Sequence, residues 1–148
     1  MYRNILIPTD GTELAEKAVT AGTEYARETG ARVLFFTAMP EYQVPTEAQM
    51  MARQRVKSLA QHEKDAERAA QAILEKAAQA AKDANITFET EFALSDRPSE
   101  AIIGAAKRHG CDAIFMASHG RTGLPALWHG SQTHDVLTHS DIPTLVYR

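Results

Sequence analysis

Five short apolar segments constrain the fold of this chain more than any other feature of its sequence. They are rich in β-branched and aromatic side chains typical of strands, and they occupy residues 4–8, 32–38, 86–94, 112–117 and 142–147. The stretches between them carry apolar residues at helical spacing instead of tight turns. Because parallel strands need such crossovers, the alternation predicts a doubly wound, five-stranded parallel sheet with helices on both faces.

Boundary signals place two helices of this Rossmann-like α/β fold. Residues 12–29 repeat apolar side chains at offsets near three and four, with Thr12 as the N-cap and Gly30 as the stop. A second helix begins near Pro98 and ends before Gly110, the asymmetry expected of a capped helix. The first of these helices presents one apolar stripe to the sheet.

The middle of the chain is less regular. Residues 46–84 are rich in Ala, Gln, Glu, Lys and Arg, and they predict a long helix that is broken near its start. Two prolines forbid a continuous helix over residues 39–54, where we expect a mobile flap over the strand ends. With no internal repeat and no linker, the order of elements predicts a single domain over residues 1–148.

Length and charge limit what the chain can bind. Its 148 residues can bury a full core, and its formal net charge of -3 gives no basic field for nucleic acid. No apolar run approaches a membrane span, and the first residues lack the order of a signal peptide. The single cysteine, Cys111, excludes an internal disulfide and a cysteine-based zinc site. We expect a cytoplasmic protein that binds neither nucleic acid nor membrane.

Ligands of such sheets bind beyond the carboxyl ends of the strands, so the residues that follow each strand are candidates for a site. After the first strand come Thr9 and Asp10, a hydroxyl and a carboxylate, and Gly11 permits a tight turn. The same residues equally suit an N-cap turn at the start of the next helix. After the second strand, Ala38 and Met39 are suited to the floor of a pocket.

The loop after the fourth strand has the composition of an anion site. Residues 117–135 read ASHGRTGLPALWHGSQTHD. Gly120 lets the backbone approach a ligand, while Gly130 and Ser131 begin the last helix, whose N–H groups and dipole favour phosphate. The alternative is that Ser131 only caps this helix and the glycines only turn. Convergence with Asp10 at the same edge of the sheet favours the anion site.

Four segments of the chain, ILIPTDGT, SHGRTG, GSQTHDVL and IPTLVYR, resemble the universal stress protein family, and the likeness runs end to end. ATP-binding members carry after the fourth strand a glycine, two residues, a glycine, nine residues, a glycine and a serine or threonine. Residues 117–131 keep this spacing, with Ala117 in place of the first glycine. The resemblance implies an adenine nucleotide alpha hydrolase-like fold that binds ATP, or AMP or ADP, together with Mg²⁺.

The resemblance also implies roles for individual residues. Phosphate contacts are implied for Gly120, Gly130, Ser131, Gln132 and Thr133. The surroundings of the base or the sugar are implied for Pro8, Thr9, Ala38 and Met116. Asp10 is implied to contact the ribose or the bound Mg²⁺.

Three loop positions leave alternatives open. Arg121 offers a charge-assisted hydrogen bond to phosphate, and His119 offers a ring N–H, although either side chain equally suits exposure to solvent. If the glycine replaced by Ala117 serves a close backbone approach, a small shift absorbs the methyl group. If it serves a positive φ, alanine costs roughly 1 kcal/mol or more. We expect the first outcome.

The sequence supports nucleotide binding more than catalysis. It offers no clear general base and no Walker-type lysine loop, so we expect at most slow ATP hydrolysis. The resemblance implies a nucleotide-dependent regulator or switch of the stress response. The alternative is an interaction module of the same family that has lost nucleotide binding, with Ala117 and Gln132 as its signs. An ATP-splitting or adenylating enzyme is a weaker hypothesis, because no acceptor-substrate domain is present.

The last strand bears on assembly. If residues 142–147 form an exposed edge of the sheet, they can pair with the same strand of a second copy. The resemblance implies the same two-fold arrangement, and both interpretations of the function include a homodimer. The alternative is an edge that a side chain or loop of the same chain covers.

Overall fold

The computed structural model of the protein describes residues 1–53, 55–118 and 130–148. The strands along these residues are β1 (Asn4–Pro8), β2 (Arg32–Met39), β3 (Phe88–Leu94), β4 (Ala113–Ala117) and β5 (Thr144–Tyr147). The helices are α1 (Glu13–Thr29), α2 (Glu47–Met51), α3 (Leu59–Asp83), α4 (Pro98–Arg108) and α5 (Gly130–His139).

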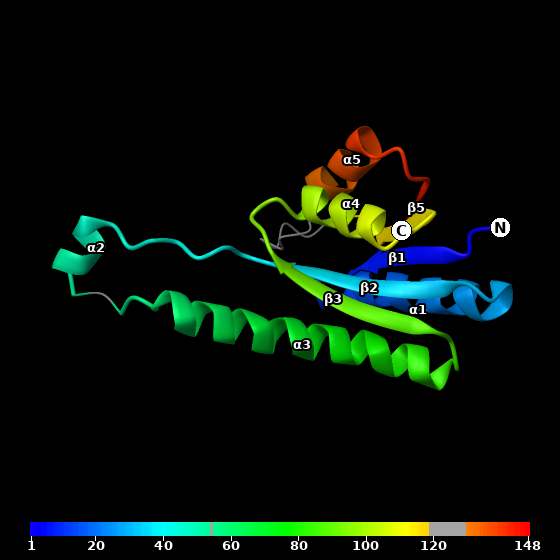
Figure 1. Ribbon diagram of the computed structural model, residues 1–148, viewed down its shortest axis with the longest axis horizontal. Helices are drawn as coiled ribbons and strands as arrows, with labels where there is room; N and C mark the ends of the chain where they lie inside the picture. Colours follow the sequence, from blue (N-terminus) through cyan, green and yellow to red (C-terminus); the bar gives the residue numbers. More distant parts are fainter. Residues whose placement is uncertain (54, 119–129) are drawn as a thin grey trace.

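The strands form one parallel sheet in the order β3-β2-β1-β4-β5, which confirms the predicted fold class (Figure 1). β1 lies at the centre, with Ile7 opposite Phe35 of β2 and Leu6 opposite Ile114 of β4. The chain passes from β1 to β2 and β3 on one side, and later to β4 and β5 on the other. The strand order therefore reverses between β1 and β4, which is where ligands of such sheets bind.

Helices cover both faces of the sheet, as the sequence predicts (Figure 1). On one face, Ile7 and Phe35 join a core with residues of α1 and α3. On the other face, Leu6 and Phe36 join a core with residues of α4 and α5. Because neighbouring residues of each central strand enter opposite cores, these strands are apolar on both sides, as is typical of buried parallel sheets.

Local sequence sets the two ends of α1. Oγ1 of Thr12 accepts a hydrogen bond of 3.3 Å from the backbone N–H of Ala15, which confirms the predicted N-cap. At the other end Gly30 has a φ of +74°, and its N–H donates to the carbonyl oxygen of Ala26 at 2.8 Å. A left-handed glycine of this kind ends a helix without strain, so the predicted stop is also confirmed.

The third strand begins two residues later than the sequence predicts. Asn85 has a φ of +55°, and its backbone N–H donates to the carbonyl oxygen of Lys82 at 3.1 Å. The N–H of Ile86 donates to the carbonyl oxygen of Ala81, also at 3.1 Å. This pair of bonds is a Schellman motif that ends α3. The helix therefore uses the amide of Ile86, and β3 begins at Phe88.

The chain between β2 and α3 forms an arm, residues 40–58 with residue 54 outside the described ranges, which projects away from the sheet (Figure 1). Our expectation of a flap over the strand ends was wrong. The reason is the length of α3: its 25 residues span about 37 Å, whereas the seven of β3 span about 23 Å. α3 therefore begins well beyond the ends of the strands, and the arm that precedes it lies beyond them too (Figure 1). The predicted break is confirmed, because α2 ends at Met51 and α3 begins only at Leu59.

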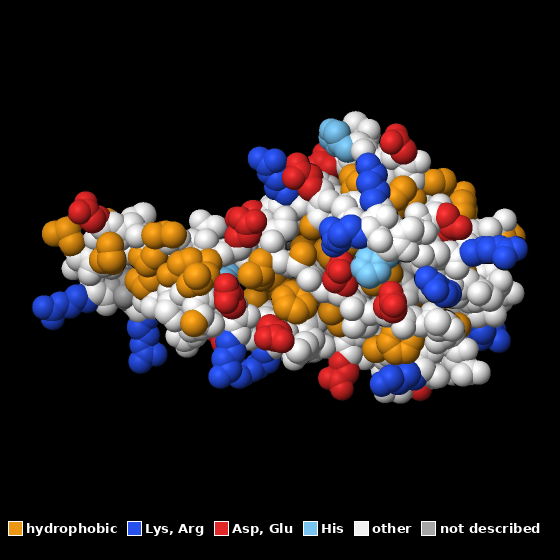
Figure 2. All heavy atoms as spheres, in the orientation of Figure 1, with side chains coloured by type: hydrophobic (Ala, Val, Ile, Leu, Met, Phe, Trp, Pro, Cys, Tyr) orange, Lys and Arg blue, Asp and Glu red, His pale blue; other side chains and the backbone are white. Residues whose placement is uncertain are grey.

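Apolar side chains gather on the arm (Figure 2). A capping box between Thr46 and Gln49 begins α2, yet none of the five residues of this helix is buried. The exposed large apolar residues of the arm and of the first position of α3 are Val44, Met50, Met51, Val56 and Leu59. In the described ranges, no helix is both long enough and apolar enough to cross a membrane.

Candidate functional site

The turn after β1 is fixed by hydrogen bonds among its own residues. The backbone N–H of Thr9 donates to the carbonyl oxygen of Phe36 at 2.8 Å, which holds the end of β1 against β2. The N–H of Gly11 donates to Oγ1 of Thr9 at 3.2 Å. The N–H and the hydroxyl of Thr12 both donate to Oδ1 of Asp10, at 2.9 and 2.7 Å. The carboxylate of Asp10 is thus held in one orientation at the carboxyl end of β1.

Asp10 supports the start of α1 and also faces the carboxyl edge of the sheet. Asp10 accepts a hydrogen bond from the N-cap residue Thr12 and so stabilises the cap. The interpretation of residues 8–12 as an N-cap turn is therefore confirmed. Asp10 is half-buried, and in the described part of the chain its second oxygen, Oδ2, accepts no hydrogen bond. Oδ2 is therefore the atom of this turn that suits a ligand hydroxyl or a cation.

The first turn of α5 is tied to the end of β4. The hydroxyl of Thr133 donates to the carbonyl oxygen of Ala117 at 3.0 Å, and Thr133 is 8% exposed. The N–H of Ser118 donates to the carbonyl oxygen of Tyr147 at 2.7 Å, which fixes the end of β4 against β5. The start of α5 therefore lies beside the carboxyl edge of β4, next to the junction with β1.

The backbone of Ala117 is ordinary for an L-amino acid. Arg53 and Asn85 are the non-glycine residues with positive φ in the described ranges, and Ala117 lies at the end of a regular strand. The methyl group therefore carries no left-handed strain. Of the two outcomes that the missing glycine left open, the one without a backbone penalty is the one that the structure supports.

Gln132 makes a contact that the sequence did not indicate. Its side-chain Oε1 accepts a hydrogen bond of 3.0 Å from the backbone N–H of Ser99, in the first turn of α4. The residue before α4, Arg97, makes no side-chain capping bond, and Pro98 follows it without an N–H. Gln132 thus supplies from α5 the cap that α4 lacks. An arginine at the N-cap was the only sequence signal that a remote acceptor was needed.

Four other predicted site residues are buried at or just after the carboxyl ends of β1, β2 and β4. Pro8 is buried at the end of β1, and Thr9 after it is 3% exposed. Ala38 and Met116 are 1% and 3% exposed and belong to the core under α4 and α5. They form the floor beneath the carboxyl edge, and the base or sugar contacts implied for them stay a prediction.

The remaining predicted residues lie between the end of β4 and the first turn of α5 in the sequence. His119, Gly120 and Arg121 lie outside the described residues. Gly130 and Ser131 open α5, so the predicted start of the last helix is confirmed. The phosphate contacts implied for Gly120, Gly130 and Ser131 stay a prediction, and the choice between phosphate and solvent stays open for His119 and Arg121.

The thiol of Cys111 is buried. Burial, and after it the negative charge of Asp112, raises the pKa of Cys111 from 9.0 to about 11, so the thiol stays protonated at neutral pH. The expectation of a small buried residue is confirmed. Over the described ranges no cluster of three or more His, Cys, Asp or Glu residues could hold a metal ion.

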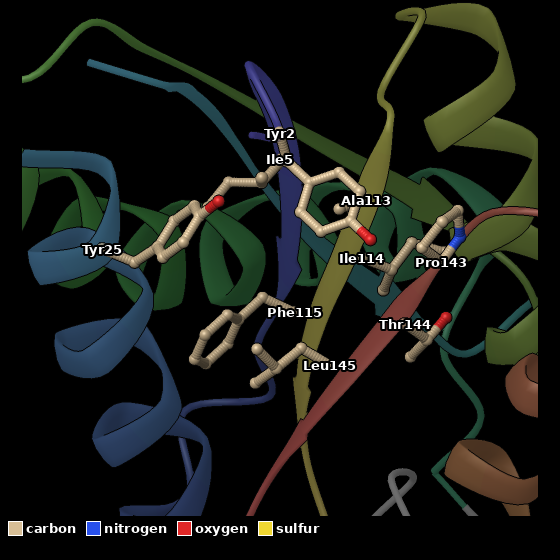
Figure 3. A pocket seen from close by; sticks show the side chains of 9 residues that line it. All are labelled: Tyr2, Ile5, Tyr25, Ala113, Ile114, Phe115, Pro143, Thr144 and Leu145. Atoms are coloured by element: carbon tan, nitrogen blue, oxygen red, sulfur yellow. The ribbon is translucent and has the colours of Figure 1, made fainter. Parts of the chain in front are cut away.

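An apolar cavity of about 290 Å³ lies at the opposite end of the sheet (Figure 3). It opens between α1 and the first residues of β1, β4 and β5. Its walls include Tyr2, Ile5, Tyr25, Phe115, Pro143 and Leu145. None of its lining residues in the described ranges carries a charged side chain, so the cavity does not suit a phosphate-bearing ligand. The sequence did not indicate this cavity, because the rule that ligands bind beyond the carboxyl ends of the strands points to the other edge of the sheet.

The chain matches the sequence model of the Universal stress protein family over residues 1–148. It is 30% identical to the universal stress protein MJ0577 of Methanocaldococcus jannaschii over 158 residues, covering 100% of this chain and 96% of that protein. It is 26% identical to the universal stress protein YxiE of Bacillus subtilis over 153 residues, covering 100% of each.

Solved structures share the fold. The structure of MJ0577 has a TM-score of 0.75 at 26% identity and covers 99% of this chain and 95% of that one. A universal stress protein in complex with cAMP has a TM-score of 0.64 at 20% identity, covering 99% and 97%. The universal stress protein from Archaeoglobus fulgidus in complex with dAMP has a TM-score of 0.64 at 17% identity, covering 99% and 98%. With a family match over its whole length, the chain belongs to the universal stress protein family.

Proposed function

We propose that this protein binds ATP in the cytoplasm and acts as a nucleotide-dependent regulator or switch of the stress response. The observation that carries the proposal is that two hydrogen-bonded turns follow neighbouring strands at the same edge of the sheet. Asp10 is held at the end of β1, and Thr133 ties the start of α5 to the end of β4. β1 and β4 are neighbours at the reversal of strand order. Two proteins of the same fold were solved with cAMP and dAMP, which favours an adenine nucleotide.

The phosphates would lie against the start of α5. Its first-turn N–H groups have no partner within the helix, and its dipole favours negative charge. The ordinary backbone of Ala117 supports this assignment, because the missing glycine imposes no strain on the approach. The proposed phosphate residues are His119, Gly120, Arg121, Gly130, Ser131 and Thr133. The proposed floor under the base and sugar comprises Pro8, Thr9, Ala38, Met116 and Ala117.

Asp10 suits a shared Mg²⁺ ion. Mg²⁺ prefers oxygen ligands and is commonly held by one or two carboxylates together with phosphates of the substrate. Oδ2 of Asp10 is such a ligand, and Thr12 holds the carboxylate through Oδ1. Because the described residues offer no complete cluster of metal ligands, the ion in this proposal arrives with the nucleotide. Without an ion, the same oxygen would accept a hydrogen bond from the ribose.

Fast catalysis is not part of the proposal. Oδ1 of Asp10 already accepts two hydrogen bonds from Thr12, and Oδ2 is assigned to the ion or the ribose. A general base for an attacking water would have to come from another residue. We therefore propose binding of the nucleotide with at most slow hydrolysis.

We further propose a homodimer through the strand 142–147. β5 pairs with β4 on one side only and lies at the edge of the sheet. Leu145 on this strand is 47% exposed, and Tyr2, which lines the same apolar cavity, is 42% exposed. An edge strand flanked by exposed apolar side chains is suited to pairing with a second copy.

One observation favours a second candidate, a dimeric interaction module without nucleotide binding. Oε1 of Gln132 is engaged with Ser99 rather than left for a ligand. The arm adds exposed apolar side chains that suit contact with another protein. In this alternative the loop before α5 would be structural, and ATP would have no effect on the protein.

Calorimetric titration of the purified protein with ATP and Mg²⁺ separates the two functions. We expect saturable heat and a rise in melting temperature at millimolar ATP, because a ligand of the native state stabilises it. A Gly130→Asp variant places a carboxylate at the start of α5 and should lose both signals. A Thr138→Asp variant adds the same charge at the exposed far end of α5 and should keep them. No heat and no thermal shift for the wild type would overturn nucleotide binding in favour of the interaction module.

A further inference from the structure

A chain of hydrogen bonds leads from the start of α5 to the base of the arm. Its first link is the bond from the N–H of Ser99 to Oε1 of Gln132, between residues 33 positions apart. Its second link lies in the turn between β3 and α4, where Oδ1 of Asp96 accepts from the N–H of Glu41 at 3.0 Å. Oδ2 of Asp96 accepts from Nε2 of Gln43 at 3.3 Å. Asp96 thus holds the first residues of the arm.

The turn between these links is itself braced. The N–H of Ser95 donates to the carbonyl oxygen of Met39 at 2.8 Å, which fixes the end of β3 to the end of β2. The N–H of Arg97 donates to Oγ of Ser95 at 3.1 Å, so the turn carries its own internal hydrogen bond. Residues 95–99 therefore form a short, cross-linked piece with Gln132 at one end and the arm at the other.

Gln132 is the only described side chain that caps α4. Arg97 makes no capping bond, and Pro98 has no N–H, so the N–H of Ser99 depends on a residue of another helix. That residue lies in the first turn of α5, the same turn that the proposed function places against phosphate. Any reordering of this turn must therefore either move the start of α4 or break the bond.

We propose that Gln132 is a positioning residue and not a phosphate ligand: it couples anion binding at the start of α5 to the turn between β3 and α4, and through Asp96 to the base of the arm. The proposal rests on the proposed function, because it needs the anion at that helix start. An anion that orders the first turn of α5 also orders its bond to Ser99. The hydrogen bonds that attach the arm to Asp96 would then respond to nucleotide. The arm carries exposed apolar side chains (Figure 1).

This coupling is reciprocal and has a measurable size. Coupling free energies between sites correspond to factors of about 5 to 150 in affinity or population. The coupling can be measured by hydrogen exchange at two backbone amides. The N–H of Ser99 donates to Gln132, and the N–H of Glu41 donates to Asp96. Nucleotide should therefore slow exchange at two places, one in α4 and one in the arm.

Hydrogen-exchange measurements on the full chain, with and without ATP and Mg²⁺, test the proposal. We expect ATP to slow exchange of the Ser99 and Glu41 amides by at least about fivefold in the wild type. Gln132→Met keeps the length of the side chain and removes the acceptor, so it should abolish both responses, and by reciprocity ATP affinity should fall by about the same fivefold factor. Gln79→Met, a matched change on the surface of α3, should leave both responses intact.

Two further variants separate the links of the chain. Gln132→Glu restores an acceptor for Ser99, so protection of that amide without ligand should return even though the added charge weakens ATP binding. Asp96→Asn weakens the hold on the arm, so the Ser99 response to ATP should persist while the Glu41 response falls. A purely structural role for Gln132 would not produce this ligand-dependent pattern.

The outcomes that overturn the proposal are distinct from those that overturn nucleotide binding. If Gln132→Met loses more than about tenfold in ATP affinity and the Ser99 response survives, Gln132 is a phosphate ligand. If the wild type binds ATP with no change at Ser99, the coupling is wrong and the proposed function stands. If the wild type binds no ATP, both proposals fall, and exchange of Ser99 in unliganded Gln132→Met then measures the cap alone.

Discussion

The hydroxyl of Thr133 donates a hydrogen bond of 3.0 Å to the carbonyl oxygen of Ala117, and this bond ties the first turn of α5 to the end of β4. Thr133→Val keeps the shape of the side chain and leaves the carbonyl without this donor. We expect it to lower the free energy of unfolding by about 1 kcal/mol and to weaken ATP binding. Thr133→Ser keeps the donor and should restore both. Urea unfolding and calorimetry measure the pair, and a valine variant that matches the wild type in both would contradict the tether.

Asp10 combines a structural and a ligand role that two variants separate. Asp10→Asn keeps an oxygen for Thr12 and removes the charge, so we expect stability within about 0.5 kcal/mol of the wild type. Its ATP affinity should no longer respond to Mg²⁺. Asp10→Ala also loses the support of the N-cap and should cost about 1 kcal/mol of stability. Thermal unfolding and titrations with Mg²⁺ or a chelator check this, and an asparagine variant that binds Mg²⁺ and ATP as well as the wild type would refute the ligand role.

Gly22 on α1 is a point of close contact with β1. A Cβ atom there would lie 2.5 Å from Cδ1 of Ile7, which is fully buried, and 3.4 Å from Cδ1 of Phe115. We expect Gly22→Ala to destabilise the protein by about 1 to 2 kcal/mol, because overpacking outweighs the better helix propensity of alanine. Gly104→Ala is the matched control, since its Cβ would meet only the end of the Arg108 side chain. It should stabilise the protein by about 0.5 to 1 kcal/mol in the same urea titration.

Cys111 makes stability depend on pH in the alkaline range. Burial raises the pKa of its thiol from 9.0 to about 11 in the folded protein. The unfolded chain loses this proton first, so the stability that the neutral thiol confers is complete below about pH 9 and declines toward pH 11. The loss amounts to about 2 kcal/mol. The difference in unfolding free energy between the wild type and Cys111→Ala should change with pH over this range, whereas parallel pH curves would show that the thiol is not responsible.

Leu145 on β5 tests the homodimer. It is 47% exposed at the edge of the sheet, and Leu137 on α5 is similarly exposed at 51%. Leu145→Lys places a charge in the proposed pairing strand and should convert the dimer to a monomer in sedimentation experiments. Leu137→Lys should leave the dimer intact. Dissociation by both variants, or by neither, would argue against pairing through this strand.

Signals that act over a few residues were the ones that the sequence predicted well. The bounds of β1, the N-cap at Thr12 and the stop at Gly30 all match. The last strand starts at Thr144 and not at Ile142, because Pro143 has no N–H to donate. Its carbonyl oxygen still accepts from the N–H of Ile114 at 2.8 Å. Caps, glycine stops and β-branched runs act locally, so one sequence suffices to identify them.

Contacts between distant parts of the chain were not predictable in the same way. The bond from Ser99 to Gln132 joins the starts of two helices, and nothing in either segment specifies the partner. Likewise Asp112 accepts hydrogen bonds from the N–H groups of Arg3 and Asn4, at 2.9 and 3.0 Å, across more than a hundred positions. The direction of the arm follows from the length of α3, which is longer than the strands that it covers. That comparison of helix and strand lengths could have corrected the expected flap.

The central place of β1 has a consequence for how the chain matures. β1 is the first strand to be synthesised, and its neighbour β4 begins 109 positions further on, while Asn4 meets Asp112 across a separation of 108. Pairings of such long range must close a long loop before they contribute, which slows folding. A nascent chain that has made only β1, β2 and β3 therefore lacks the junction between β1 and β4. If the proposed function holds, nucleotide at that junction would stabilise only chains in which β4 has paired with β1, so its occupancy would report on the formation of that pair as well as on ATP concentration.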